Sequence, residues 1–192
     1  VKRVFTMKAK AMNACIVFAE ELKSCTNVRY APYDTLKESR AELQELLEEE
    51  IKLQQIQELP MKMMQFVSLI NPTDAIHAID RIIDKRKDAI LIHNSSFMTG
   101  LYYELSGLCQ TENCLTILAA LEILKNRGYE ISKKDYHTGF SDVCEMTGLM
   151  GRWQKLQSYP DVICDTGHNA DGFKCIRQQL NYIHNKLNQE LH

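Results

Sequence analysis

The fold class of this chain is decided by residues 146–172, which run M-T-G-L-M-G-R-W-Q-K-L-Q-S-Y-P-D-V-I-C-D-T-G-H-N-A-D-G. Residues 161–165 predict a strand that ends in a carboxylate, and a small polar turn at 166–169 leads into a predicted helix over 171–187. In an open α/β sheet, ligands bind at the carboxyl ends of strands, where the following helix presents free N–H groups to anions. This stretch therefore predicts an α/β fold with a ligand site at the turn.

Hydrophobic periodicity predicts further helices and strands on the N-terminal side of this stretch. Strands are expected at residues 15–19, 27–30, 88–93, 101–105 and 153–156. Helices are expected at residues 2–12, 61–70, 111–126 and 132–145, the last capped by Ser132, and from a cap at Thr73 or Asp74 to residue 83. Helices and strands alternate and no internal repeat appears, which favours α/β over all-α.

A long amphipathic helix is predicted over residues 35–59, where leucines and isoleucines recur at helical spacing among Glu, Gln and Lys. Fewer than three clean heptads are present, so packing on its own domain is favoured over a coiled coil or a partner-binding helix. The partner-binding alternative stays open. It predicts a dimer that polar replacements of Leu43, Leu47 and Ile51 would dissociate.

Composition and charge exclude several classes of protein. The 192 residues are 45% hydrophobic and 25% charged with a net charge of −2, so no basic excess exists for nucleic acid, and no apolar run is long enough for a membrane span. Seven cysteines without a C-x-x-C pair indicate reduced, buried thiols and a cytoplasmic protein. The sequence starts at Val1 and is amphipathic from its first residues, which suggests a piece of a larger protein.

Three side chains near the turn carry candidate chemistry. Asp165 could accept hydrogen bonds from ribose hydroxyls, His168 could donate to a ribose or phosphate oxygen, and the planar guanidinium of Arg152 suits phosphate. Each has a plainer alternative. Asp165 could cap the following helix, His168 could cap or pack in the turn, and Arg152 could stack or pair on the surface beside Trp153.

Two spaced motifs resemble one enzyme family. The stretches G-R-W-Q at 151–154 and D-T-G-H-N at 165–169 are similar to a signature of folylpolyglutamate synthase and dihydrofolate synthase, members of the Mur ligase superfamily. The stretch L-S-G-L-C-Q-T-E-N at 105–113, followed by T-I-L-A-A-L-E at 116–122, resembles the segment that closes the family's central domain. The resemblance covers residues 101–185, is weak over 2–20, and is absent over 34–95.

The resemblance implies an ATP-dependent ligase that joins L-glutamate to a folate or dihydropteroate through an acyl phosphate. Asn113, Arg152, Asp165 and His168 would contact the nucleotide, with Arg152 and His168 as the catalytic residues. ATP and Mg²⁺ are the implied cofactors, and no metal ligand is expected in this stretch. Ala170 stands where the family commonly has Pro, and Thr166 and Gly167 replace its usual Gly and Ala.

The implied domain organisation places residues 1–147 in the rear part of a Mur-ligase-like central domain, with a helical insert at 35–86. Residues 148–192 would begin a Rossmann-like C-terminal domain with its first βα unit, and residues 149–153 would form the hinge. No glycine of the chain is followed by lysine, so the phosphate-binding loop G-x-x-x-x-G-K-[ST] is absent. We therefore expect the isolated chain to be inactive; the alternative is a non-catalytic module in which helices 35–86 bind a partner or dimerise.

Overall fold

The computed structural model describes residues 2–14, 16, 18, 25–54, 72–85, 87–94 and 97–187 as a mixed α/β fold with two antiparallel sheets. The helices are α1 (Lys2–Ala11), α2 (Tyr33–Gln54), α4 (Thr73–Asp84), α5 (Gln110–Asn126), α6 (Lys133–Ser141), α7 (Val143–Thr147) and α8 (Ala170–Leu187). The strands are β1 (Cys25–Ala31), β2 (Ala89–Asn94), β3 (Phe97–Tyr103), β4 (Gln154–Ser158) and β5 (Asp161–Cys164). None of these helices combines the length and apolar character needed to cross a bilayer.

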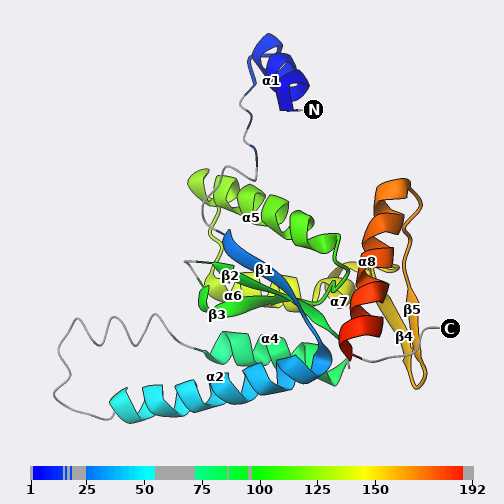
Figure 1. The fold of residues 1–192 in the computed structure, drawn as a ribbon. Helices are drawn as coiled ribbons and strands as arrows, with labels where there is room; N and C mark the ends of the chain where they lie inside the picture. Colours follow the sequence, from blue (N-terminus) through cyan, green and yellow to red (C-terminus); the bar gives the residue numbers. More distant parts are fainter. Residues whose placement is uncertain are drawn as a thin grey trace.

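The central sheet has the order β1-β2-β3 and separates two layers of helices (Figure 1). Its strands are antiparallel, with Ile90 opposite Tyr103 and Leu91 opposite Tyr102. Because successive side chains point to opposite faces, Leu91 and Tyr102 lie on one face and Ile90 and Tyr103 on the other. Both faces are therefore apolar, as expected of a sheet covered on two sides.

One face of the sheet packs against α2 and α4. Ile79 and Ile82 of α4 and Leu36 of α2 are fully buried there, and Leu43 of α2 joins them at 5% exposure. Three-to-four-residue spacing places these side chains on single helical stripes. The prediction that the long helix packs on its own domain is confirmed for this part of α2.

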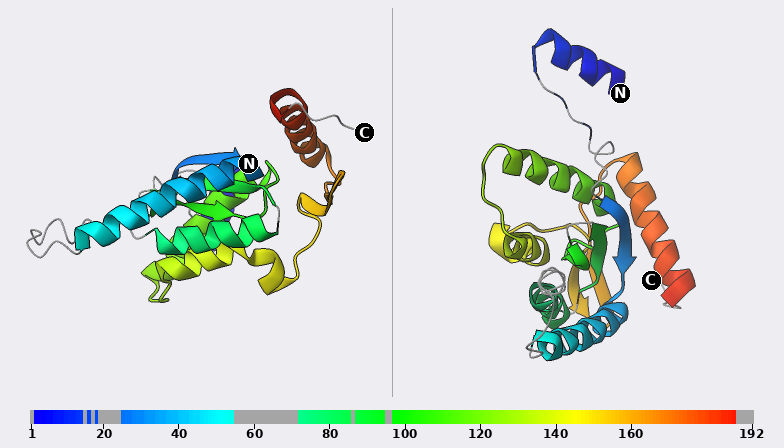
Figure 2. Two further views of the ribbon diagram at one scale, coloured as in Figure 1. Left: turned by 90° about the horizontal axis from the view of Figure 1, so that it is seen from below. Right: turned by 90° about the vertical axis from the view of Figure 1, so that its left-hand side faces the viewer.

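The opposite face packs against α5 and α6. Leu101 of β3 and Cys114 of α5 are fully buried, and the rings of Tyr103 and Phe140 meet edge to face with their centroids 5.1 Å apart. Ser132 caps α6 as predicted, because its hydroxyl accepts from Asp135 N while the Asp135 carboxylate accepts from Ser132 N. Figure 2 shows α5 across the sheet from α2, and α6 beside α4, with which it is in contact.

Several sequence predictions need correction. Neither Thr73 nor Asp74 caps α4, because the helix begins one residue earlier, with Pro72 in the cap position and no side-chain cap. The third strand runs from Phe97 to Tyr103 rather than over 101–105, and its residues 101–103 are all buried rather than alternating. The predicted helix at 61–70 lies outside the described residues, as does most of the predicted strand at 15–19.

The helix predicted over 132–145 is broken at Asp142 into α6 and α7. A continuous helix would join Cys144 N to Phe140 O. Instead Phe140 O accepts from Glu104 N at 3.1 Å, and Cys144 N donates to the Glu104 carboxylate at 2.6 Å. Glu104 therefore supplies the donor for Phe140 O and the acceptor for Cys144 N, which replace the helical hydrogen bond between these two groups. Hydrophobic periodicity does not reveal such a tertiary contact.

The C-terminal part consists of the β4–β5 hairpin and α8, which lie beside the central sheet in Figure 1. The predicted strand, turn and helix are present as β5, residues 165–169 and α8. The partner of β5 is β4, paired antiparallel, with Gln154 opposite Cys164. These findings show mixed α/β architecture, and the finer Mur-ligase-like and Rossmann-like assignments remain expectations.

Candidate functional site

Asp165 joins the two turns of the G-R-W-Q and D-T-G-H-N stretches. One carboxylate oxygen accepts from Trp153 N and the other from Gly167 N, both at 2.8 Å. The backbone adds a direct link, since Thr166 N donates to Gly151 O at 2.8 Å. Asp165 therefore holds the ends of the hairpin together, and a ribose hydroxyl would have to share oxygens that already accept backbone N–H groups.

The turn before β4 has an unusual backbone. Gly151 has φ +71, and a Cβ there would collide with the Thr166 side chain. Trp153 has φ +52, which is rare for a bulky residue. Its side chain is 7% exposed, and its buried indole Nε1 has no hydrogen-bond partner within the described part of the chain. Such strained and unsatisfied groups gather at functional sites, which supports this turn as the candidate site.

Arg152 and His168 both lie exposed on this turn. A guanidinium nitrogen of Arg152 donates to the Thr166 hydroxyl, and among the described residues no carboxylate forms an ion pair with it. His168 Nδ1 lies 3.2 Å from Thr166 O, which leaves its Nε2 facing away from that contact. Thr166 thus orients both side chains, and the remaining guanidinium donors of Arg152 are available to an anion.

The cap of α8 is supplied by Asn169, not by Asp165. Asn169 Oδ1 accepts from Gly172 N at 2.8 Å, the usual pattern of an N-cap side chain. The plainer alternative for Asp165 as a helix cap is therefore wrong. Its hydrogen bonds with Trp153 N and Gly167 N show that it fixes the conformation of the turn.

Asn113 lies exposed in the first turn of α5. Its amide donates to the side chain of the buried Gln110 at 2.8 Å. No hydrogen bond or ion pair connects it to Arg152, Asp165 or His168 in the ranges that the structure describes. The structure thus brings three of the four predicted site residues onto one turn and leaves Asn113 on a neighbouring element.

The two motif-bearing stretches nevertheless lie against each other. A Cβ on Gly107 would lie 3.3 Å from Trp153 Cβ. The side chain of Gln179 on α8 is 1% exposed; it donates to Ser106 O at 2.9 Å and accepts from Leu108 N at 2.8 Å. Gln179 is not among the residues predicted from the sequence, although an amide between Ile176 and Ile183 on one helix face was a detectable signal.

Comparison of the chain with family models, curated proteins and solved structures finds no match. Within the described ranges, no group of three or more His, Cys, Asp or Glu side chains is placed to hold a metal ion.

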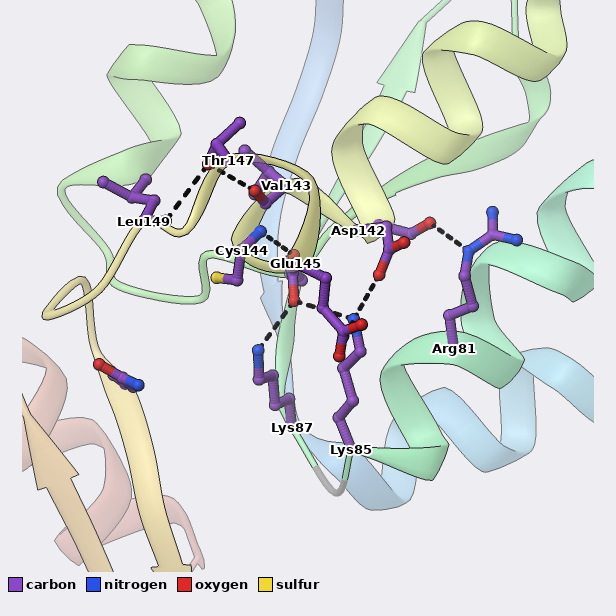
Figure 3. A network of polar contacts seen from close by, with 12 residues as sticks. Arg81, Lys85, Lys87, Asp142, Val143, Cys144, Glu145, Thr147 and Leu149 are labelled. Atoms are coloured by element: carbon purple, nitrogen blue, oxygen red, sulfur yellow. Dashed lines mark hydrogen bonds and ion pairs between the residues drawn. The ribbon is translucent and has the colours of Figure 1, made fainter.

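A second polar cluster surrounds Glu104, just after β3. Its carboxylate, fully buried, lies 2.8 Å from Lys87 Nζ and 3.7 Å from Lys85 Nζ. Figure 3 shows Lys85 and Lys87 extending side by side toward Asp142, Cys144 and Glu145. Burial lowers the pKa of Lys85, but the Asp142 hydrogen bond and the charges of Glu104, Asp142 and Glu145 outweigh it, so the net shift is upward. This cluster ties the end of α4 to the α6–α7 break.

Proposed function

We propose that the chain carries part of the nucleotide side of an ATP-dependent acid–amino-acid ligase of the folylpolyglutamate and dihydrofolate synthase type. The observation that carries the proposal is the contact between the two motif-bearing stretches. Gly107 packs on Trp153, about forty-five residues later in the sequence, and Gln179 of α8, the helix that follows the D-T-G-H-N stretch, binds residues 106 and 108. Two independent sequence resemblances therefore meet in one place.

The exposed side chains at the turn fit a polyphosphate. Arg152 has unpaired guanidinium donors, which match phosphate oxygens in geometry and charge. His168 would contact the same ligand, while Asp165 would keep the turn in shape. ATP supplies the phosphoryl group that activates a carboxylate for amide formation, and Arg152 would help neutralise the phosphate charge. Asn113 lies on α5, so it would contact the nucleotide from that helix and not from the turn.

The proposal includes the domain organisation and the substrates. Residues 1–147 would belong to the central domain and 148–192 to the C-terminal domain, joined by the connector that holds Gly148 and Gly151, both with positive φ. The β4–β5 hairpin exposes Leu156 and Val162, as the first unit of a larger sheet would. Mg²⁺ ligands are expected elsewhere. Folate or dihydropteroate and L-glutamate would be the substrates of a cytoplasmic enzyme.

Binding of Mg-ATP to the chain tests this proposal. Titration calorimetry at low ionic strength should detect weak binding, and Arg152→Met should weaken it about tenfold, equivalent to about 1.4 kcal/mol, because a charge-assisted phosphate contact is lost. Arg177→Met is the matched control, since it removes the same charge from an exposed position on α8. Equal losses in the two variants, or no binding by the unchanged chain, would contradict the proposal.

A second candidate function is dimerisation or partner binding through α2. The C-terminal half of α2 projects beyond α4 in Figure 1 and carries Leu46 and Ile51 at 41% and 46% exposure. Glu45, Glu48 and Glu49 flank them. An apolar stripe with a charged rim resembles a helix-docking surface.

Replacing Leu46 and Ile51 together with lysine should dissociate any dimer formed through α2, because charge then enters its apolar contact. Sedimentation velocity at several concentrations measures this. Leu43 and Leu47 are unsuitable positions because Leu43 lies in the core and Leu47 packs against it, so their replacement would unfold the domain. Met146→Lys, at another exposed apolar position, is the control. A chain that sediments as a monomer at all concentrations removes this candidate.

A further inference from the structure

Two cysteines lie near each other where α8 meets the loop before α5. Cys109 is the residue that precedes α5, and Cys175 lies in the second turn of α8. Both are free thiols and both are partly exposed. Cys175 and the Asp165 carboxylate both lie near enough to Cys109 to raise the pKa of its thiol.

The backbone around the two thiols is fixed by contacts that do not involve sulfur. Cys175 and Gln179 are four residues apart, so they share one face of α8. Gln179 hydrogen-bonds Ser106 O and Leu108 N, which places the loop residue adjacent to Cys109 directly against that face. The close approach of Gly107 to Trp153 fixes the same loop by a further contact. The approach of the two thiols is therefore a property of the fold.

We propose that Cys109 and Cys175 form a thiol–disulfide switch that locks α8 to the loop at 106–110. The oxidant is a low-molecular-weight disulfide, RSSR. One cysteine thiolate attacks RSSR and releases one RSH; the second attacks the mixed disulfide and releases another. Two thiols and RSSR thus become one protein disulfide and two RSH, and two electrons pass from the protein to RSSR.

The surroundings of Cys109 disfavour its thiolate form. Burial raises the pKa of the Cys109 thiol, and Cys175 and Asp165 raise it further. Because the thiolate is the attacking species, attack by Cys109 becomes faster as the pH rises. Cys114 takes no part because it is fully buried.

The locked form would affect the proposed ligase site, and this consequence rests on the proposed function. The disulfide would join the 105–113 stretch covalently to α8, the helix that follows the D-T-G-H-N stretch. Closure between the two predicted domains needs movement about residues 149–153, and a second fixed connection would restrict it. Oxidation would thereby hold the site in one arrangement.

The test is disulfide mapping of the whole chain after equilibration in glutathione buffers of increasing oxidised fraction. Alkylation and peptide mass spectrometry should show Cys109–Cys175 as the main crosslink, and closure of this loop should raise the thermal midpoint by about 5 °C or more. Cys109→Ser and Cys175→Ser should each abolish the crosslink and the shift. Cys144→Ser, at a half-buried thiol of another cluster, should retain both.

Free alkylation of both thiols under oxidising buffer, or pairing of Cys175 with Cys164 instead, would overturn the switch. The mapping uses no nucleotide, so it is independent of the ligase proposal. Failure of the reduced chain to bind Mg-ATP would count against the ligase alone, and the crosslink would still identify the switch.

Discussion

Replacing Lys87 with methionine should lower the free energy of unfolding by about 3 kcal/mol, because it leaves a buried carboxylate without its nearest cation. The Glu104 side chain is fully buried and Lys87 Nζ lies 2.8 Å from it. The remaining cation, Lys85, is 3.7 Å away and is shared with Asp142 and Glu145. Urea unfolding followed by circular dichroism measures the loss.

A second substitution identifies the cause. In the Lys87→Met background, Glu104→Gln removes the buried charge and keeps an oxygen that can accept from Cys144 N. The double variant should therefore be more stable than Lys87→Met alone, a sign that a simple loss of packing would not give. Lys37→Met, which breaks an exposed pair with Asp34, should leave the unfolding midpoint nearly unchanged. A double variant less stable than Lys87→Met would contradict the charge argument.

Glu104 also explains why part of the fold could not be predicted. A glutamate at the end of an apolar strand indicates a solvent-facing position, and the 132–145 pattern predicts one helix. In the structure Glu104 is buried, and its backbone and carboxylate divide that helix at Asp142. Helix periodicity carries no information about a donor and acceptor supplied by a strand about forty residues earlier.

Local signals were more informative where the structure depends on neighbouring residues. Ser132 caps α6 as the sequence predicted, and the Asp135 side chain completes a capping box with it. The amphipathic pattern of α2 correctly indicated burial of Leu36 and Leu43 on its own domain. These features need only contacts within a few residues or a single apolar stripe.

The candidate site also has features that the sequence predicts and features that depend on distant contacts. The sequence predicts a turn after β5 with Asp165 and His168, and the structure places Arg152 beside them through Thr166. The role of Asp165 as a bridge to Trp153 N was not predictable, because it depends on the antiparallel return of β4. The contact with residues 106–108 depends on Gln179, whose partners lie more than seventy residues away.

Stability should fall between pH 6.5 and pH 4 because His137 is buried as the neutral imidazole. Its side chain is 4% exposed, and burial lowers its pKa to about 4; Asp74 opposes the shift, and Arg81 and Lys133 add to it. Below pH 6.5 the unfolded chain binds a proton that the folded chain does not bind, so protonation favours unfolding. Over the interval from 6.5 to about 4 this amounts to about 3 kcal/mol.

The pH effect is measured as a difference between the unchanged chain and His137→Gln. Substitution alters packing by an amount that does not depend on pH, whereas the proton linkage is lost, so the stability gap between the two proteins should narrow by about 3 kcal/mol from pH 7.5 to pH 4. Urea unfolding of both proteins at half-unit pH intervals measures this difference in the free energy of unfolding. His77→Gln changes an exposed histidine on α4 and should leave the pH dependence in place. A gap that stays constant with pH would show that His137 takes up its proton in the folded chain as readily as in the unfolded one.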